Sequence, residues 1–258
     1  MPHSKTLLVR PPSSRMAEGQ ITHIAKPTSV SHERAQAQWE AYVDIYRAEG
    51  WTVVEVPVAD DCPDCVFIED AVVMFGNTAV ITAPGTPSRA AEPVAVEAAI
   101  RAALPDVCVA RIEGTGTLDG GDVLKVGKDV YVGLGVRTNA EGVRQLRRIV
   151  HAEGYCLHAV PVTKALHLKS AVTALPDGTV IGWLPIVDNP SIFPRFMPVP
   201  EEHGVAVVVL SDEHVLMSND APETTKLLER MGFTVTTVGI SEFEALEGCV
   251  TCLSVRVR

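Results

Sequence analysis

The chain has 258 residues, of which 47% are hydrophobic, and its mean hydropathy of +0.18 indicates enough apolar surface for a sizeable core. The formal net charge of −10 and the isoelectric point near 5.3 argue against a surface that binds nucleic acid or anionic lipid. A small cationic ligand is the partner that this charge favours. One compact domain and two small ones are both compatible with this length.

No segment approaches the roughly 18 consecutive apolar residues that a membrane-spanning helix needs, so no membrane partner is expected. Six cysteines in a chain without a recognisable secretory signal favour reduced thiols over a disulfide framework. We therefore expect a cytoplasmic protein that binds neither nucleic acid nor membrane. Its oligomeric state stays open between a monomer and a homodimer.

The first predicted elements are a strand, a helix and a second strand. Ala35, Trp39 and Tyr42 belong to an apolar stripe at helical spacing, which indicates packing against a sheet and not a ligand site. Gly50 then ends the helix. The predicted bounds are residues 5–10 for the first strand, 33–49 for the helix and 51–56 for the second strand.

The rest of the chain repeats one pattern, in which two strands joined by a tight turn are followed by a helix and a third strand. Several units of one kind predict a radial array. The first and last strands of the chain would complete a fifth unit by bringing the two ends together. A doubly wound sheet with several hairpins is the alternative. The units span residues 71–112, 122–160, 171–200 and 205–238, and the third is proline-rich and irregular after residue 185.

Cys252 lies where a turn of small residues runs into an alternating strand over residues 253–257. A thiol at the mouth of a strand can be a nucleophile, although most free cysteines are small buried residues of a core. Cys249 and Cys252 also form C-x-x-C, a spacing found in redox and metal sites. Together with the pair Cys62 and Cys65, they could form a four-thiolate zinc or redox module.

The other candidate site residues lie between the predicted units. Asp64, Glu69 and Asp70 fall within seven positions of one another, and paired carboxylates are suited to hold a guanidinium or an ammonium group. Asp119 precedes a glycine pair, which lets the backbone approach a ligand closely. Three further residues stand alone at the exits of loops, where each by itself is more typical of a surface or structural position: Arg89, Arg137 and His167.

Six segments of this chain, taken in order, resemble the dimethylarginine dimethylaminohydrolase family of the guanidino-modifying superfamily. Each segment alone is weak evidence, but six in the family's order are specific and span most of the chain. The resemblance implies the pentein fold, an α/β architecture in which repeated ββαβ units form a five-bladed propeller with pseudo-fivefold symmetry. It also implies a single domain over residues 1–258 with its site at the central channel. The segments are Pro63-Asp64-Cys65-Val66-Phe67-Ile68-Glu69-Asp70, Pro84-Gly85 with Ser88-Arg89, Leu118-Asp119-Gly120-Gly121-Asp122, Arg137-Thr138-Asn139, Leu166-His167-Leu168-Lys169-Ser170 and Thr251-Cys252.

The resemblance further implies a role for each candidate residue. Cys252 would be the nucleophile, His167 the general acid and base, and Asp119 the carboxylate that orients the histidine. No metal and no organic cofactor is expected. The implied substrate contacts are Glu69 and Asp70 at the guanidinium, Asp64 at the α-ammonium, Arg89 and Arg137 at the α-carboxylate, and main-chain groups near Gln20 and Leu246.

The implied reaction is hydrolysis of asymmetric dimethylarginine or monomethylarginine to citrulline and dimethylamine or methylamine. An ordinary thiol is mostly protonated at neutral pH, but a bound cation beside it favours the thiolate. Cys252 would then form a covalent thiouronium adduct, while His167 would protonate the departing amine and later deprotonate water. An arginine deiminase of the same superfamily is the alternative, although those enzymes carry an extra helical domain for which this chain has no room.

Overall fold

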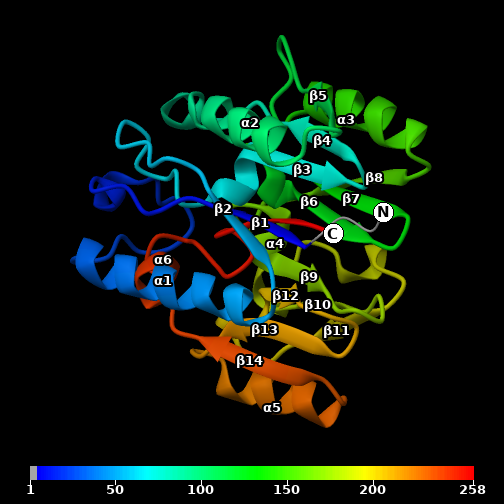
Figure 1. The fold of residues 1–258 in the computed structure, drawn as a ribbon. Coiled ribbons are helices and arrows are strands. Elements are labelled where there is room, and N and C mark those ends of the chain that lie inside the picture. The colour runs from blue at the N-terminus through cyan, green and yellow to red at the C-terminus, as the bar shows by residue number, and fades with distance from the viewer. Residues whose placement is uncertain (1–4) are drawn as a thin grey trace.

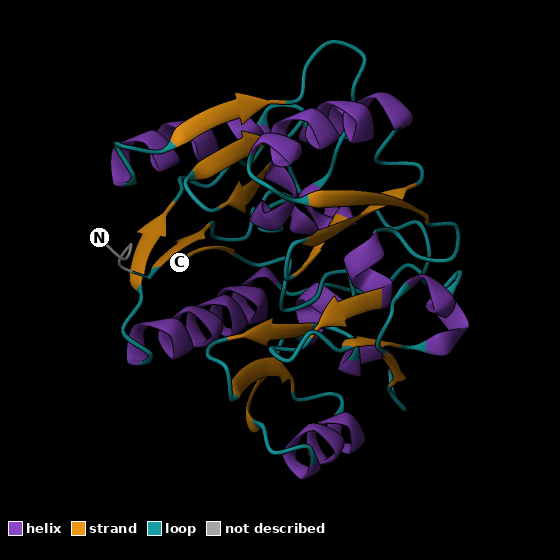
Figure 2. Cartoon of the chain, turned by 90° about the vertical axis from the view of Figure 1, so that its right-hand side faces the viewer, coloured by secondary structure: helices purple, strands orange, loops and turns teal. Residues whose placement is uncertain are grey.

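The structure, a computed structural model, describes residues 5–258 and contains five separate sheets of three strands each. The sheets stand around a common centre, with helices on the outside (Figure 1). A view from the side shows the same arrangement of small sheets and covering helices (Figure 2). The five-bladed α/β propeller is therefore confirmed, and the described strands do not join into one doubly wound sheet.

In every sheet the middle strand pairs antiparallel with one neighbour and parallel with the other. The antiparallel hairpins turn tightly, as at Gly76 and Gly127, whose φ angles of 55° and 60° suit a residue without a Cβ atom. A parallel pair needs a longer crossover, which a helix supplies in most blades. Three blades have the full pattern: β3 (Val72–Phe75), β4 (Thr78–Ile81), α2 (Glu92–Ala103) and β5 (Cys108–Arg111); β6 (Val123–Val126), β7 (Asp129–Leu134), α3 (Ala140–Ala152) and β8 (Cys156–Pro161); β12 (Val207–Val209), β13 (His214–Ser218), α5 (Pro222–Arg230) and β14 (Thr234–Val238).

One blade departs from the pattern in the proline-rich segment that was predicted to be irregular. It contains β9 (Val172–Ala174) and β10 (Val180–Gly182), after which two 3-10 turns replace the covering helix. The sequence-based prediction missed β11 (Phe196–Pro198), which pairs in parallel with β10. Pro198 can occupy this strand because β11 lies at the edge of its sheet, where one side of the strand has no ladder partner.

The two ends of the chain close the ring, as expected. Strand β15 (Val255–Val257) pairs antiparallel with β1 (Thr6–Val9), and β1 pairs in parallel with β2 (Thr52–Glu55). Helix α1 (His32–Ala48) connects β1 to β2 and buries the predicted apolar stripe, so this stripe is part of the core. The pairing brings the segment of Cys252, which lies three residues before β15, close to β1, and Cys252 belongs to one core cluster with Leu7 and Val9.

A short helical turn precedes the first strand of several blades. These turns are residues Ile68–Ala71 before β3, Gly120–Asp122 before β6 and the helix α4 (Leu168–Ala171) before β9. The first and second turns pack together, as do the second and third. Because equivalent positions of different blades meet around the centre, residues far apart in sequence converge there. One further short helix, α6 (Ser241–Glu244), was not predicted.

None of the helices in the described part of the chain is both long and apolar enough to cross a bilayer.

Candidate active site

The short turns at the centre of the propeller carry the predicted chemistry-bearing residues. Asp70 lies within the turn before β3, whereas Asp119 and His167 immediately precede the turns before β6 and β9. Cys252 lies in the equivalent segment before β15. Pseudosymmetry thus gathers four residues from four blades at one place, as the repeat pattern predicts.

A small cavity of about 20 Å³ lies at this place. Nearly all of the side chains that were predicted to form a site contribute to its wall, and Asp119 contacts it through His167. Such a volume holds about one water molecule, so the structure shows a closed site. The lining residues are Gln20, Asp64, Phe67, Asp70, Arg89, Arg137, Leu166, His167, Leu246, Glu247, Gly248 and Cys252.

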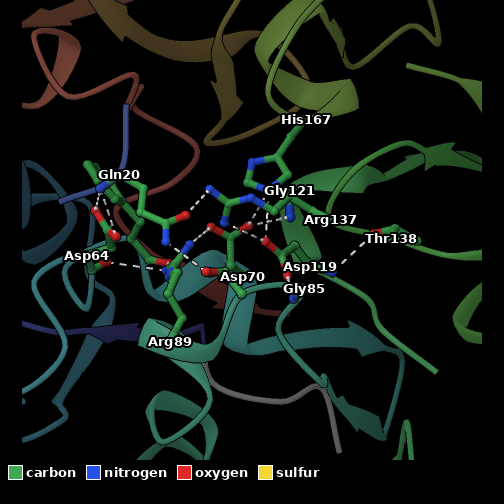
Figure 3. A network of polar contacts seen from close by, with 12 residues as sticks. Gln20, Asp64, Asp70, Gly85, Arg89, Asp119, Gly121, Arg137, Thr138 and His167 are labelled. Atoms are coloured by element: carbon green, nitrogen blue, oxygen red, sulfur yellow. Dashed lines mark hydrogen bonds and ion pairs between the residues drawn. The ribbon is translucent and has the colours of Figure 1, made fainter. Parts of the chain in front are cut away.

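His167 and Asp119 form a buried ion pair at the centre of the site (Figure 3). The His167 Nε2 atom lies 3.0 Å from Asp119 Oδ2, and the two side chains are 5% and 0% exposed. The backbone N–H of Gly85 donates to Asp119 Oδ1 at 2.8 Å, so both carboxylate oxygens have partners. The aspartate is therefore held in a position that fixes the imidazole.

The charge around His167 determines its protonation. Burial alone would lower the pKa of the imidazole, but the carboxylates of Asp70, Asp119 and Asp122 raise it to about 9. His167 is therefore an imidazolium at neutral pH. A cationic imidazole is the form that can donate a proton to a leaving group.

Asp70 is the second carboxylate at this centre. Arg89 Nη1 donates to its Oδ2 atom at 2.6 Å, and the Gly121 backbone N–H donates to Oδ1 at 2.7 Å (Figure 3). Despite burial, the charges of His167 and Arg89 hold the pKa of Asp70 well below its usual range. A Cβ atom at Gly121 would lie 2.7 Å from Asp70 Oδ1 and 2.8 Å from the His167 ring, so glycine is required for this close approach.

The guanidinium of Arg89 forms hydrogen bonds with several buried groups of the protein. Besides Asp70, its guanidinium donates to both oxygens of Glu92, at 2.9 and 2.8 Å, and to the carbonyl of Phe67 at 3.0 Å. Arg89 and Glu92 are 3% and 1% exposed. Arg89 lines the cavity as expected, but its guanidinium stabilises buried carboxylates in this structure.

Gln20 closes the opposite side of the cavity. Its side-chain Oε1 accepts from Arg137 Nη2 at 2.9 Å, and its backbone N–H lies 3.2 Å from Asp64 Oδ2 (Figure 3). Arg137 Nη1 lies 3.5 Å from Asp119 Oδ2. Burial raises the pKa of Asp64 despite the nearby charge of Arg89. Asp64 and Arg137 thus present opposite charges at one end of the site.

Glu247 holds the loop that carries Gln20. Its carboxylate accepts from the backbone N–H groups of Thr22, His23 and Ile24, with Thr22 at 2.8 Å and Ile24 at 3.0 Å. Glu247 has a φ of 62°, an unusual conformation for a residue other than glycine. The sequence analysis did not identify Glu247, although it directly follows Leu246, which lines the cavity as predicted.

Cys252 lies in the wall of the cavity with its sulfur next to a second thiol. The Sγ atoms of Cys249 and Cys252 are 3.2 Å apart, and Cys249 Sγ is also 3.2 Å from Thr251 Oγ1. The segment is anchored by the buried hydroxyl of Tyr42, which donates to the Val250 carbonyl at 2.9 Å. Tyr42 was assigned only to the core, because helical spacing does not reveal which hydroxyl finds a polar partner.

Glu69 is the predicted residue whose carboxylate the structure does not bring into this cavity. Its Oε1 atom pairs with Lys169 Nζ at 2.6 Å and with Arg256 Nη2 at 3.2 Å, and the residue lines a neighbouring cavity. Its backbone N–H donates to the Cys252 carbonyl at 3.2 Å. Glu69 therefore contacts the nucleophile segment through its main chain.

The two C-x-x-C pairs do not meet. All six cysteines are free, and no group of possible metal ligands within residues 5–258 contains Cys62, Cys65, Cys249 and Cys252 together. This separation of the two cysteine pairs does not favour the four-thiolate module.

A different group, Asp70, Asp119 and His167, is close enough to share an ion, but His167 and Arg89 already neutralise these two carboxylates.

Another residue that the sequence analysis did not single out is Asp122. Its Oδ2 accepts from the Thr138 hydroxyl at 2.6 Å and its Oδ1 from the Leu168 backbone N–H at 2.9 Å, so it joins its own blade to the turn that follows His167. Burial raises its pKa to about 6. The signal was present in the sequence, because Asp122 closes the segment that begins at Leu118.

Comparisons with known proteins agree with this site. The chain matches the arginine deiminase family model over residues 33–182. It is 56% identical to an N(G),N(G)-dimethylarginine dimethylaminohydrolase of Streptomyces coelicolor, with 99% of this chain and 98% of that protein covered.

Two solved structures are similar throughout. One is a histidine-to-glycine variant of a dimethylarginine dimethylaminohydrolase, in an adduct with S-methyl-L-thiocitrulline. Its TM-score is 0.90 and its sequence identity is 29%, and the match covers 97% of this chain and 98% of that chain. The other is a cysteine-to-serine mutant of the Pseudomonas aeruginosa enzyme complexed with citrulline, with a TM-score of 0.89, 30% identity and the same coverage. With its fold, its ordered segments and these relatives in agreement, the chain belongs to the dimethylarginine dimethylaminohydrolase family.

Proposed function

We propose that this protein hydrolyses asymmetric dimethylarginine and monomethylarginine to citrulline and the corresponding methylated amine. The observation that carries the proposal is the meeting of Cys252, the His167 imidazolium and buried carboxylates in one closed cavity. These groups supply a nucleophile, a proton donor and a place for a guanidinium. The relative from Streptomyces coelicolor bears the name of this activity.

The first half-reaction uses the cation of the substrate to activate the thiol. In the unliganded site the hydrogen bond with Cys249, burial and the nearby charges of Glu69 and Asp70 raise the pKa of Cys252, so its thiol is neutral. A guanidinium bound beside it favours the thiolate, so the thiol releases its proton to solvent and the thiolate attacks the guanidinium carbon. His167 then gives its proton to the departing amine nitrogen, the C–N bond breaks, and a thiouronium adduct on Cys252 remains.

The second half-reaction reverses the role of the histidine. Neutral His167 takes a proton from water, and the resulting hydroxide equivalent attacks the adduct carbon. The C–S bond breaks, citrulline forms, and the thiol is restored. Asp119 keeps the imidazole in place through both steps and stabilises its protonated form. No step needs a metal or an organic cofactor.

Asp64 and Arg137 in the cavity wall support recognition of a free amino acid. Asp64 would bind the α-ammonium and Arg137 the α-carboxylate, with main-chain groups of Gln20 and Leu246 beside them. Arg137 now donates to the Gln20 side chain, so substrate would replace Gln20 as its partner. The loop that carries Gln20 must therefore move before an arginine-sized molecule enters.

Two of the expected substrate contacts take a modified form in this proposal. Asp70 binds the guanidinium, and Arg89 keeps Asp70 in place while its other hydrogen bonds go to Glu92 and Phe67. Glu69 could reach the guanidinium only by leaving Lys169 and Arg256. Its negative charge already acts on Cys252 from its present position.

The test is release of citrulline by the purified protein from asymmetric dimethylarginine, monomethylarginine, arginine and a peptidyl arginine. Both methylated amino acids should react far faster than the other two. A peptidyl arginine lacks the free α-ammonium and α-carboxylate groups that would bind Asp64 and Arg137. A dry pocket also leaves the extra N–H donors of arginine without partners. A preference for arginine would assign the protein as a deiminase instead.

We also propose that residues 1–258 act as one domain and that the protein resides in the cytoplasm as a homodimer. Six free thiols suit a reducing compartment. Light scattering after size-exclusion chromatography measures the mass of the assembly, and a mass of one chain would remove the dimer from the proposal.

A further inference from the structure

A second, larger cavity lies beside the substrate cavity and has a volume of about 400 Å³. The two cavities share Leu166, Glu247 and Gly248 in their walls, and Cys249 belongs to the wall of the larger one. Because the Cys249 sulfur contacts the Cys252 sulfur, the reacting thiol lies directly behind this wall. Any molecule in the larger cavity is thus a close neighbour of the reaction centre.

The lining of the larger cavity combines apolar and negatively charged groups. Ile186 and Ile240 contribute apolar surface, while Glu202, Asp220 and Glu244 contribute carboxylates. Lys164 is the single lysine or arginine among its lining residues. This combination suits a small cation that carries alkyl groups, since the carboxylates attract its charge and the apolar wall contacts its carbons.

Among the carboxylates that line this cavity, Glu244 has a buried oxygen without a hydrogen-bond partner. It is 8% exposed, and its Oε2 atom has no hydrogen-bond partner, while Oε1 lies 3.5 Å from His203 Nδ1. Burial and the neighbouring carboxylate of Asp220 raise the pKa of Glu244, although the Ser218 hydroxyl and His203 oppose the shift. A buried carboxylate oxygen without a donor is costly, and a cationic N–H donor in the cavity would remove that cost.

We propose that this cavity binds an alkylammonium ion, and that its ligand is the methylamine or dimethylamine released at Cys252. This inference rests on the proposed function. In the first half-reaction the C–N bond breaks and the His167 proton moves to the nitrogen, which yields a neutral amine. An alkylamine has a pKa close to that of lysine, about 10.4, so it takes a second proton from solvent and becomes a cation at neutral pH. As a cation it donates to Glu244, and its methyl groups pack against the isoleucines.

Occupation of the larger cavity would remove the amine from the adduct before water attacks. An amine that stayed in the substrate cavity could attack the thiouronium carbon and regenerate the substrate. Transfer past Leu166 and Gly248 therefore favours the forward reaction.

The test is calorimetric titration of dimethylammonium chloride into the purified protein without substrate, with sodium chloride as the reference salt. The wild type should bind dimethylammonium, and Glu244→Gln, which keeps the shape but removes the charge, should weaken binding about tenfold. The matched control is Glu141→Gln on α3, which removes a carboxylate that pairs with Arg144 and does not line the cavity, so binding should stay unchanged.

A second variant covers the event that Glu244→Gln does not fold. Glu202 is exposed at the rim of the cavity, so Glu202→Gln removes no buried contact and should weaken binding to a smaller extent. Saturating citrulline, which fills the substrate cavity, should leave dimethylammonium binding in place. Binding that citrulline abolishes, or that neither variant weakens, would overturn the inference.

Failure of the amine site and failure of the proposed function give different results. A protein that releases citrulline from methylarginines but fails the titration refutes the amine site alone. A protein that binds dimethylammonium through Glu244 but releases no citrulline keeps the alkylammonium site, but it refutes both the hydrolase assignment and the released amine as the ligand.

Discussion

The Sγ atoms of Cys249 and Cys252 lie 3.2 Å apart, and the hydrogen bond between them is the largest contribution that raises the pKa of Cys252. Without substrate the nucleophile is therefore a neutral thiol, and a bound cation is needed to favour the thiolate. Cys249 belongs to the wall of the neighbouring cavity, whereas Cys252 lines the substrate cavity. The two thiols of the C-x-x-C segment thus have different positions and should have different functions.

Replacement of these cysteines separates the two functions. Cys252→Ser should lose turnover and keep its fold, because a nearby cation cannot ionise a hydroxyl as it ionises a thiol. Cys249→Ser is the matched control and should remain active. Citrulline release measures activity, and thermal unfolding measures the fold. Equal loss in both variants, with a stoichiometric metal in the wild type, would favour the four-thiolate module.

His167→Gly should separate the two half-reactions. With a substrate whose leaving group needs no protonation, the variant should form the adduct on Cys252 but fail to hydrolyse it, because no base remains to activate water. Mass spectrometry after a rapid quench should therefore show the adduct accumulating on the peptide that contains Cys252. Normal steady-state turnover by His167→Gly would remove this residue from the mechanism.

The stability of the fold should fall as the pH rises through the titration of His167. Its pKa is raised from 6.5 to about 9 in the folded state, so the stabilisation is fully present below pH 6.5 and is lost as the pH rises through about 9. This shift contributes at most about 3.4 kcal/mol to the free energy of unfolding. Urea unfolding at a series of pH values measures the change.

A matched pair of variants tests whether His167 causes this pH dependence of the stability. His167→Asn should remove most of it, whereas His151→Asn, at the exposed end of α3, should leave it unchanged. An unchanged slope in His167→Asn would contradict the assignment.

Arg137→Ala should weaken substrate binding while the fold persists. A charge-assisted contact with a carboxylate contributes roughly 1.5 to 3 kcal/mol, so KM for both methylated substrates should rise about ten- to a hundredfold. Arg144→Ala, which removes an exposed arginine from α3, is the control. A KM that stays at the wild-type value would show that the α-carboxylate binds elsewhere.

Arg89→Ala should act mainly on stability. The variant leaves the buried carboxylates of Asp70 and Glu92 without their cation, and breaking a buried pair in this way costs about 3 to 5 kcal/mol. Urea unfolding should show this loss at neutral pH. If Arg89→Ala instead keeps wild-type stability and raises only KM, then Arg89 binds the substrate directly.

The sequence determined the repeating architecture, because each hairpin, helix and strand depends on local patterns of apolar residues and turn residues. The spacing of strands around Gly76 and Gly127 predicted two blades, and the apolar stripe of α1 predicted its buried face. The order of six short segments was enough to identify Cys252, His167 and Asp119 as the candidate catalytic residues.

The tertiary structure decided which groups these residues meet. Glu69 pairs with Arg256, 187 positions away, and Glu247 holds a loop more than 220 positions before it. Such partners depend on how the blades close around the centre, and no local pattern contains that information. For the same reason, only the packed structure shows that Arg89 stabilises Asp70 and Glu92. It also shows that one carboxylate oxygen of Glu244 lies without a hydrogen-bond partner at a second cavity behind Cys249.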